Sequence, residues 1–184
     1  MQKRTPLYEE HLGLGAKMVD FGGWAMPVNY GSQVEEHLAV RSDAGMFDVS
    51  HMTIVDVSGA NSEGFLRHVL ANDVKRLSEN QALYSLMLNE TGGIIDDLIV
   101  YKLKDRYRCV FNGATESAVR SWITGFKSED VVLNFSRMVM IALQGPNAIK
   151  CLLSFESISG LEQLKSFFSM QFESWLIART GYTG

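Results

Sequence analysis

Polar and hydrophobic positions along the chain follow two periods. Alternation with a period of two predicts strands, and apolar residues that recur at helical spacing predict helices. The predicted strands lie at residues 47–59, 82–88, 94–103, 107–111, 137–144 and 172–178. The predicted helices lie at residues 32–45, 61–73, 114–126 and 145–155, and the Gly-rich stretch 15–30 reads as short strands and turns.

Local signals mark several helix ends. Ser32 and Glu35 have the spacing of a capping box, and Gly45 follows the end of the same helix. Thr5 before Pro6 predicts another helix start, because proline is favoured at the first helical position. The helix at 61–73 has an apolar face formed by Phe65, Leu66, Val69 and Leu70.

Short strands joined by tight turns define the fold class. The sequence Asn-Glu-Thr-Gly-Gly at residues 89–93 is typical of the turn of a β-hairpin. Hairpins with interspersed helices predict an α+β fold, with antiparallel sheets flanked by helices, rather than a doubly wound parallel sheet. The sequence contains no glycine-rich dinucleotide or P-loop motif, which argues against nucleotide binding.

Composition and charge narrow the classes of function. The 184 residues are 46% hydrophobic and 21% charged, with a net charge of −4, which is ordinary for a globular protein. Because the basic residues are scattered, we expect neither nucleic acid nor an anionic membrane as a partner. No apolar run approaches the roughly 18 residues of a membrane span, and the N-terminus does not resemble a secretory signal.

The cysteines and histidines indicate no metal site. Cys109 and Cys151 lie far apart in apolar contexts, and the four histidines form no ligand pattern with them. Two buried, reduced thiols are expected, which fits a cytoplasmic protein.

Asp96 and Asp97 stand inside a stretch that otherwise reads as a buried strand. Alternation places Asp96 with Ile94 and Leu98 on one face, and Asp97 on the opposite face. The aspartates can bind backbone amides near the turn, as Asp often does. Alternatively, one carboxylate faces a ligand pocket, where an apolar setting shifts its pKa. Spacing alone leaves both possibilities open.

Several long blocks of the sequence occur in a characteristic order: DFGGWAMPVNYGSQVEEHLAVRSDAGMFDVSHM, ALYSLMLNETGGIIDDLIVY, IALQGPNA and RTGYTG. Together they resemble the aminomethyltransferases of the glycine cleavage system, or T-proteins, of bacterial type. The resemblance runs from Thr5 to Gly184 and implies the folate-binding T-protein fold. It assigns 1–53 with 138–184 to an incomplete first domain and 54–137 to a second α+β domain. The C-terminal barrel domain of the family, its pterin-binding glutamate and its later arginines are expected beyond these residues.

The resemblance implies a specific reaction. Proteins of this family bind tetrahydrofolate and take the aminomethyl group carried on the lipoyl arm of H-protein. They release ammonia and form 5,10-methylenetetrahydrofolate. The catalytic aspartate of the family corresponds to Asp97, beside the folate N10, where a carboxylate can accept or relay a proton. Asp96 is then expected to be structural. The family is commonly monomeric and cytoplasmic, and a chain of this extent is expected to be inactive alone.

Four further residues match the folate site of the family, and each has a simpler structural explanation. Two of them, a methionine and a strand tyrosine, can serve as core residues. The other two can have structural roles, one at the start of a helix and one in a turn. The four residues are Met52, Tyr84, Asn112 and Tyr182.

The chain departs from the family pattern around Asn112 and at a later aromatic pair. Residues 111–114 read Phe-Asn-Gly-Ala, where Val-Asn-Ala-Ala is commoner in the family. Phe111 and Gly113 are therefore expected to change the edge of the pocket. Phe167 stands where some relatives have tyrosine, and it lacks that hydroxyl. His51 can contact a ligand, although a histidine beside a strand is more often structural.

Two other functions are compatible with a folate-binding fold of this kind. One is a folate-binding accessory protein for iron–sulfur cluster maintenance, whose Lys-Gly-Cys-Tyr motif is replaced here by RTGYTG. The other is the folate domain of a larger amine-demethylating oxidase, which would carry a flavoprotein part before it. Both rank below aminomethyl transfer.

Overall fold

A computed structural model describes residues 2–180, which cluster into two compact units. Unit 1 contains residues 2–51 and 138–163, and unit 2 contains residues 52–137 and 164–180. The sequence-based division assigns 164–180 to the first domain, whereas these residues cluster with unit 2. They do so because Phe168 forms a β-bridge with Gln81, directly before the first strand of the main hairpin.

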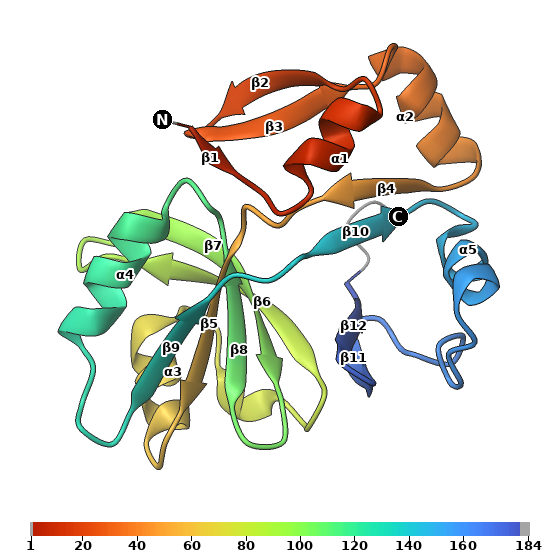
Figure 1. The fold of residues 1–184 in the computed structure, drawn as a ribbon. Helices are drawn as coiled ribbons and strands as arrows, with labels where there is room; N and C mark the ends of the chain where they lie inside the picture. The colour runs from red at the N-terminus through yellow and green to blue at the C-terminus, as the bar shows by residue number, and fades with distance from the viewer. Residues whose placement is uncertain (1, 181–184) are drawn as a thin grey trace. The chain divides into compact units, whose positions relative to one another are not determined.

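Unit 1 consists of two small sheets and three helices (Figure 1). One sheet has the order β1-β3-β2, with β1 parallel to β3, and the other pairs β4 with β10 antiparallel. The elements are β1 (Lys3–Arg4), α1 (Tyr8–Gly13), β2 (Lys17–Phe21), β3 (Trp24–Asn29), α2 (Gln33–Ser42), β4 (Gly45–Asp48), β10 (Ile141–Gln144) and α5 (Ala148–Phe155).

Unit 2 contains a five-stranded antiparallel sheet of order β6-β7-β8-β5-β9, followed by a separate hairpin of β11 and β12. Its elements are β5 (Thr53–Ser58), α3 (Ser62–Val69), η1 (Val74–Arg76), β6 (Ala82–Leu88), β7 (Ile94–Lys102), β8 (Tyr107–Phe111), α4 (Glu116–Gly125), β9 (Val132–Ser136), β11 (Phe168–Phe172) and β12 (Trp175–Arg179).

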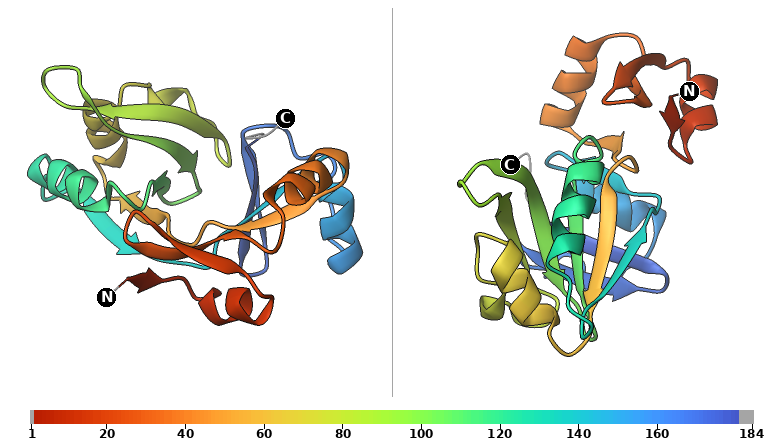
Figure 2. Two further views of the ribbon diagram at one scale, coloured as in Figure 1. Left: turned by 90° about the horizontal axis from the view of Figure 1, so that it is seen from above. Right: turned by 90° about the vertical axis from the view of Figure 1, so that its left-hand side faces the viewer.

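The core of unit 2 lies between one face of this sheet and helices α3 and α4, which both lie on that face (Figure 2). The fully buried Val55, Val100 and Cys109 come from three adjacent strands. Phe65 from α3 and Val119 from α4 pack against them. The helical period of these two segments therefore places their apolar faces on the sheet, as predicted.

The predicted α+β class with antiparallel sheets is confirmed. Helix α2 begins after Ser32, whose side chain accepts a hydrogen bond from the Glu35 amide, as the capping-box spacing predicts. Helix α1 begins at Tyr8, later than the Thr5–Pro6 signal suggests, because the backbone around Pro6 forms a turn first.

Two predicted strands are corrected. The strand at 47–59 is divided into β4 and β5, because the Asp48 carboxylate accepts the Ser50 amide at 2.8 Å and closes a turn. The strand at 172–178 is the second half of a hairpin, β11–β12, which reverses near Glu173 at a φ of 49°. The edge strand β9 was not predicted.

The two cysteines differ in environment. Cys109 lies in the core of unit 2, where burial raises the pKa of its thiol well above the usual range. Cys151 is exposed, so the expectation that both thiols are buried is wrong for this one. Its helix, α5, has no buried residue. Within residues 2–180, no helix is long and apolar enough to cross a membrane.

Candidate functional site

The register of the five-stranded sheet brings three of the residues proposed from the sequence to the level at which β8 ends. Phe111, the last residue of β8, pairs with Leu98 on one side and with Thr53 on the other. The residues one step further out are Asp97 and Asn112, with Met52 on the third strand. Strand β8 therefore ends and β5 begins at this level of the sheet, whereas β7 continues past Asp97 to Ile94.

Asp97 and its polar neighbours form a hydrogen-bonded group on the exposed sheet face. The Tyr84 hydroxyl donates to Asp97 Oδ2 at 3.2 Å. The Asn112 side-chain amide donates to Asp97 Oδ1 at 3.1 Å and to the Asp97 main-chain carbonyl at 3.2 Å. Each carboxylate oxygen of Asp97 thus has its own donor, which fixes the rotamer of an otherwise mobile surface side chain.

Asp96 is the buried member of the pair, with 4% exposure, whereas the Asp97 side chain is exposed. The burial of Asp96 agrees with the structural role expected for it, whereas the exposed Asp97 does not lie in the apolar setting considered for one of the two carboxylates. Asp96 accepts the Asn112 backbone amide at 3.0 Å and the Asn112 side-chain amide at 2.7 Å. The backbone bond expected near the hairpin turn is instead made at the end of β8.

A bulge breaks the strict alternation assumed for this strand. Met87 pairs with Asp96, but Leu88 pairs with Ile94, so β7 contains one extra residue at this point. As a result Ile94 is 66% exposed and Ile95 packs against the core. The prediction that Ile94 shares the face of Asp96 is therefore wrong, while Leu98 shares it as expected.

Two hollows of unit 2 are lined by residues other than Asp97. One, of about 450 Å³, is lined by residues that include Ile95 and Trp122. Another, of about 410 Å³, is lined by residues that include Arg67 and Asn72. The Asp97 side chain itself is exposed, and its hydrogen bonds are made to Tyr84 and Asn112.

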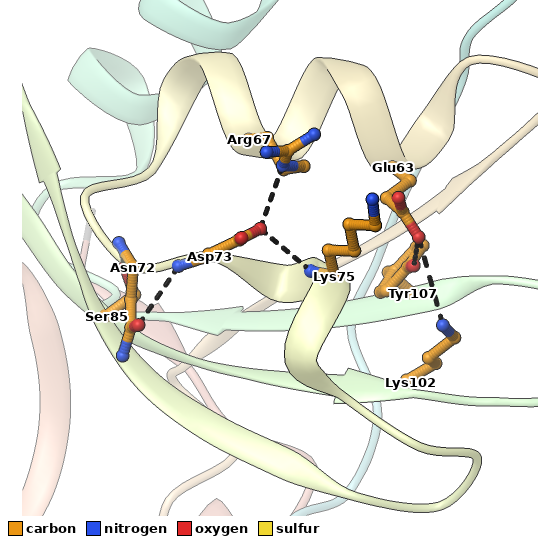
Figure 3. Close-up of polar contacts among 8 residues, drawn as sticks. All are labelled: Glu63, Arg67, Asn72, Asp73, Lys75, Ser85, Lys102 and Tyr107. Atoms are coloured by element: carbon orange, nitrogen blue, oxygen red, sulfur yellow. Dashed lines mark hydrogen bonds and ion pairs between the residues drawn. The ribbon is translucent and has the colours of Figure 1, made fainter.

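The strand that carries Tyr84 is anchored by a separate set of polar contacts (Figure 3). The Ser85 hydroxyl accepts the Asn72 backbone amide at 3.0 Å, and the Asn72 side chain donates to the Tyr84 carbonyl at 3.1 Å. The next residue, Asp73, accepts from Arg67 at 2.8 Å and ties this loop to α3. Sequence reasoning did not find Asn72 or Ser85, because nothing in their local pattern differs from an ordinary turn and strand.

The remaining candidate residues make no hydrogen bond to Asp97 within residues 2–180. Met52 is half-buried directly before β5. Phe167 has a φ of 58°, and its backbone amide donates to the Arg179 carbonyl at 2.6 Å. Gly113, which follows Asn112, is buried. Tyr182 lies outside the described residues.

His51 belongs to unit 1, where it contacts two aromatic rings. Its ring lies edge-on to Phe21, at 5.5 Å between centroids, and to Trp24 at 6.5 Å. Its Nδ1 is buried without a hydrogen-bond partner in the described part of the chain. Burial lowers the pKa of His51 from its ordinary value of 6.5, although the charge of Asp48 acts in the opposite direction.

This pKa shift predicts a loss of stability in mild acid. The unfolded chain binds a proton at this histidine more tightly than the folded chain does. The free energy of unfolding should therefore fall as the pH drops below about 6.5 and show no such penalty above it. His51→Gln should weaken this dependence in urea titrations at pH 7.5 and 5.5, and the exposed His68→Gln should not. Equal pH dependence in wild type and His51→Gln would contradict the assignment.

Tyr84→Phe tests the hydroxyl that holds Asp97. Tyr84 is 50% exposed, so its replacement should leave the fold intact. Loss of one hydrogen bond to a carboxylate should cost about 1 kcal/mol of transition-state stabilisation, or roughly fivefold in kcat of the full-length protein. Tyr107→Phe is the matched control, because that hydroxyl also donates to a carboxylate, Glu63 at 3.3 Å, but lies remote from Asp97. The same change in kcat for both variants would argue against a specific role.

The chain as a whole is similar to known proteins that are named aminomethyltransferases. The family model described as the GCVT N-terminal domain matches residues 7–184. An aminomethyltransferase of Alcanivorax borkumensis is 50% identical over 189 residues, which cover all of this chain and 53% of that protein. An aminomethyltransferase of Pseudomonas syringae pv. tomato is 52% identical over 190 residues, with the same coverage.

A solved structure gives the same result for the fold. The crystal structure of the glycine cleavage system aminomethyltransferase T from Bartonella henselae superposes with a TM-score of 0.92 at 35% identity. The match covers the whole of this chain and 51% of that one.

The chain therefore belongs to the GCVT N-terminal domain family, and its fold is that of the N-terminal part of a T-protein. It spans about half the length of the curated relatives that it matches.

Proposed function

We propose that the protein is the tetrahydrofolate-dependent aminomethyltransferase of the glycine cleavage system. In this reaction the carbon of the aminomethyl group carried by lipoyl H-protein is transferred to tetrahydrofolate and its nitrogen is released as ammonia, which leaves 5,10-methylenetetrahydrofolate and dihydrolipoyl H-protein. The family membership and the names of the matched relatives support this activity. Those names also favour it over the iron–sulfur accessory function.

One observation carries the proposal. The carboxylate of Asp97 is exposed, yet it is held by the Tyr84 hydroxyl on one oxygen and by the Asn112 amide on the other. An ordinary surface aspartate gains little from two ordered donors, because water serves it as well. Such ordering is expected where a carboxylate must meet a ligand in a defined position.

The side chains at this site suit the chemistry of a reduced folate. Tetrahydrofolate supplies the nitrogen atoms that accept the one-carbon unit and lose protons when the methylene bridge closes. Asp97 offers the charged oxygen that can accept or relay a proton. Met52, at the same edge of the sheet, would contribute apolar contact.

Asp97 has two functions in this proposal. Its charge orients the reacting N–H by accepting a hydrogen bond, and its basicity provides a route for the departing proton. Tyr84 and Asn112 keep the carboxylate in one position during both steps. We place the reaction in the cytoplasm, with a full-length monomer that contacts H-protein transiently.

The proposal is tested with full-length protein and H-protein that carries the aminomethyl group. Rapid ammonia release is expected only when tetrahydrofolate is present, with formation of methylenetetrahydrofolate in equal amount. H-protein whose lipoyl arm carries no aminomethyl group is the control and should give no ammonia. Failure to release ammonia, or the same rate with and without folate, would contradict the proposal.

A further inference from the structure

Asp96 occupies an unusual position for a carboxylate. It faces Met87 across the β6–β7 pair and shares the core face with Leu98, both of which are essentially inaccessible to solvent. A buried carboxylate is strongly unfavourable unless its oxygens are hydrogen-bonded or paired with a cation. Within residues 2–180, no cation lies within ion-pair distance of Asp96, and both of its hydrogen bonds come from Asn112.

These two bonds fix the whole of Asn112. Asp96 Oδ2 accepts the backbone amide at 3.0 Å, which sets the path of the chain at the end of β8. Asp96 Oδ1 accepts the side-chain Nδ2 at 2.7 Å, which sets the amide rotamer. A flipped amide would place its oxygen against the carboxylates of Asp96 and Asp97, so electrostatic repulsion excludes the flip.

The orientation of this amide in turn determines how Asp97 is held. One N–H of Nδ2 is engaged by Asp96, and the other is shared between Asp97 Oδ1 at 3.1 Å and the Asp97 carbonyl at 3.2 Å. If Asp96 did not accept the first N–H, the Asn112 side chain would be free to rotate away from Asp97. Because Asp96 and Asp97 are both hydrogen-bond acceptors, the link between them is made by the Asn112 amide.

We propose that Asp96 is a positioning residue for the reaction, which acts on Asp97 through Asn112. A purely structural carboxylate would be needed only for the stability of the hairpin. A positioning carboxylate is needed for the geometry of its exposed neighbour. This inference rests on the proposed role of Asp97 in aminomethyl transfer.

A double-mutant cycle in the full-length protein tests the inference. Asp96→Asn keeps the size of the side chain but turns one of its two acceptors into a donor that faces a donor. It should lower kcat roughly ten- to a hundredfold, as loss of an outer partner does at other sites, while KM for tetrahydrofolate changes by less than about twofold. In an Asn112→Ala background the same replacement should change kcat by less than about twofold, because the link is already broken.

Stability must be separated from positioning in this test. Asp56→Asn is the matched control, because Asp56 is also a largely buried carboxylate of the sheet, bound by Arg108 at 2.7 Å and Arg106 at 3.0 Å. It should lower the denaturation midpoint but leave kcat per folded molecule unchanged. If Asn112→Ala does not fold, Asn112→Ser provides the second background.

The possible outcomes distinguish the inference from the proposed function. An equal loss of kcat after Asp96→Asn in both backgrounds would overturn the positioning role. Wild-type kcat in Asp96→Asn beside an inactive Asp97→Asn would also overturn it and leave the proposed function intact. A fully active Asp97→Asn would instead refute the proposed role of Asp97.

Discussion

Asp97→Asn should reduce the rate of aminomethyl transfer by roughly 10²–10⁴-fold, the usual range for loss of a general acid–base group. Asparagine has the same shape and retains one oxygen to accept a hydrogen bond, but it carries neither the charge nor the basicity of the carboxylate. Because the loss concerns the transition state, it should appear in kcat more than in KM for tetrahydrofolate. Single-turnover release of ammonia from aminomethyl H-protein measures the effect directly.

The fold should survive this replacement, since the Asp97 side chain is exposed and contributes no core contact. Asp105→Asn is the control: this carboxylate is 72% exposed, binds Arg106 and lies between β7 and β8. Its kcat should equal that of the wild type. A wild-type rate for Asp97→Asn would remove the proposed role of Asp97.

Asn112→Asp should have the second-largest effect, on both stability and activity. The change is isosteric, but it replaces the amide that donates to Asp96 and Asp97 with a third carboxylate at hydrogen-bonding distance from the other two. Loss of these bonds beside a buried charge should cost about 3 kcal/mol in the free energy of unfolding at neutral pH. Urea denaturation measures this loss, and kcat should fall in parallel because Asp97 loses its donor.

The pH dependence identifies the cause of that loss. Neighbouring carboxylates raise the folded-state pKa of the introduced carboxyl group above its unfolded value. The folded state therefore regains stability, relative to wild type, as the pH falls and the introduced group becomes protonated. Asn61→Asp makes the same chemical change at the exposed N-terminus of α3, where a negative charge is favourable, and should cost nothing. A destabilisation of Asn112→Asp that is independent of pH would contradict this explanation.

The hairpin that carries the aspartates was predictable because its turn chemistry is local. Asn89 Oδ1 accepts the backbone amides of Thr91 and Gly93, which closes the turn between β6 and β7. Strand β9 was not predictable in the same way. It lies at the edge of the sheet beside β5, and its burial depends on partners far away in the sequence.

Alternation alone could not predict which of Asp96 and Asp97 is buried, again because the answer depends on distant parts of the chain. Alternation does place the two carboxylates on opposite faces, but it does not say which face is covered by helices. That depends on how α3 and α4 pack, and the bulge near Ile95 further disturbs the pattern. The link from Asp96 to Asn112 joins residues on neighbouring strands, and only the register of β7 with β8 shows it.

The candidate site was proposed from the family resemblance rather than from local pattern. The structure brings Tyr84, Asp97 and Asn112 into direct hydrogen-bonding contact, although nothing in their spacing requires it. The roles of these residues toward folate remain predictions. Met52 shares their edge of the sheet through the register of β5 with β8.

A crystal structure of the full-length protein with bound tetrahydrofolate is the most direct test of the central claim. We expect a carboxylate oxygen of Asp97 within hydrogen-bonding distance of the folate N10, with Tyr84 and Asn112 still bound to that carboxylate. A folate bound elsewhere on the protein, with Asp97 facing only water, would contradict it.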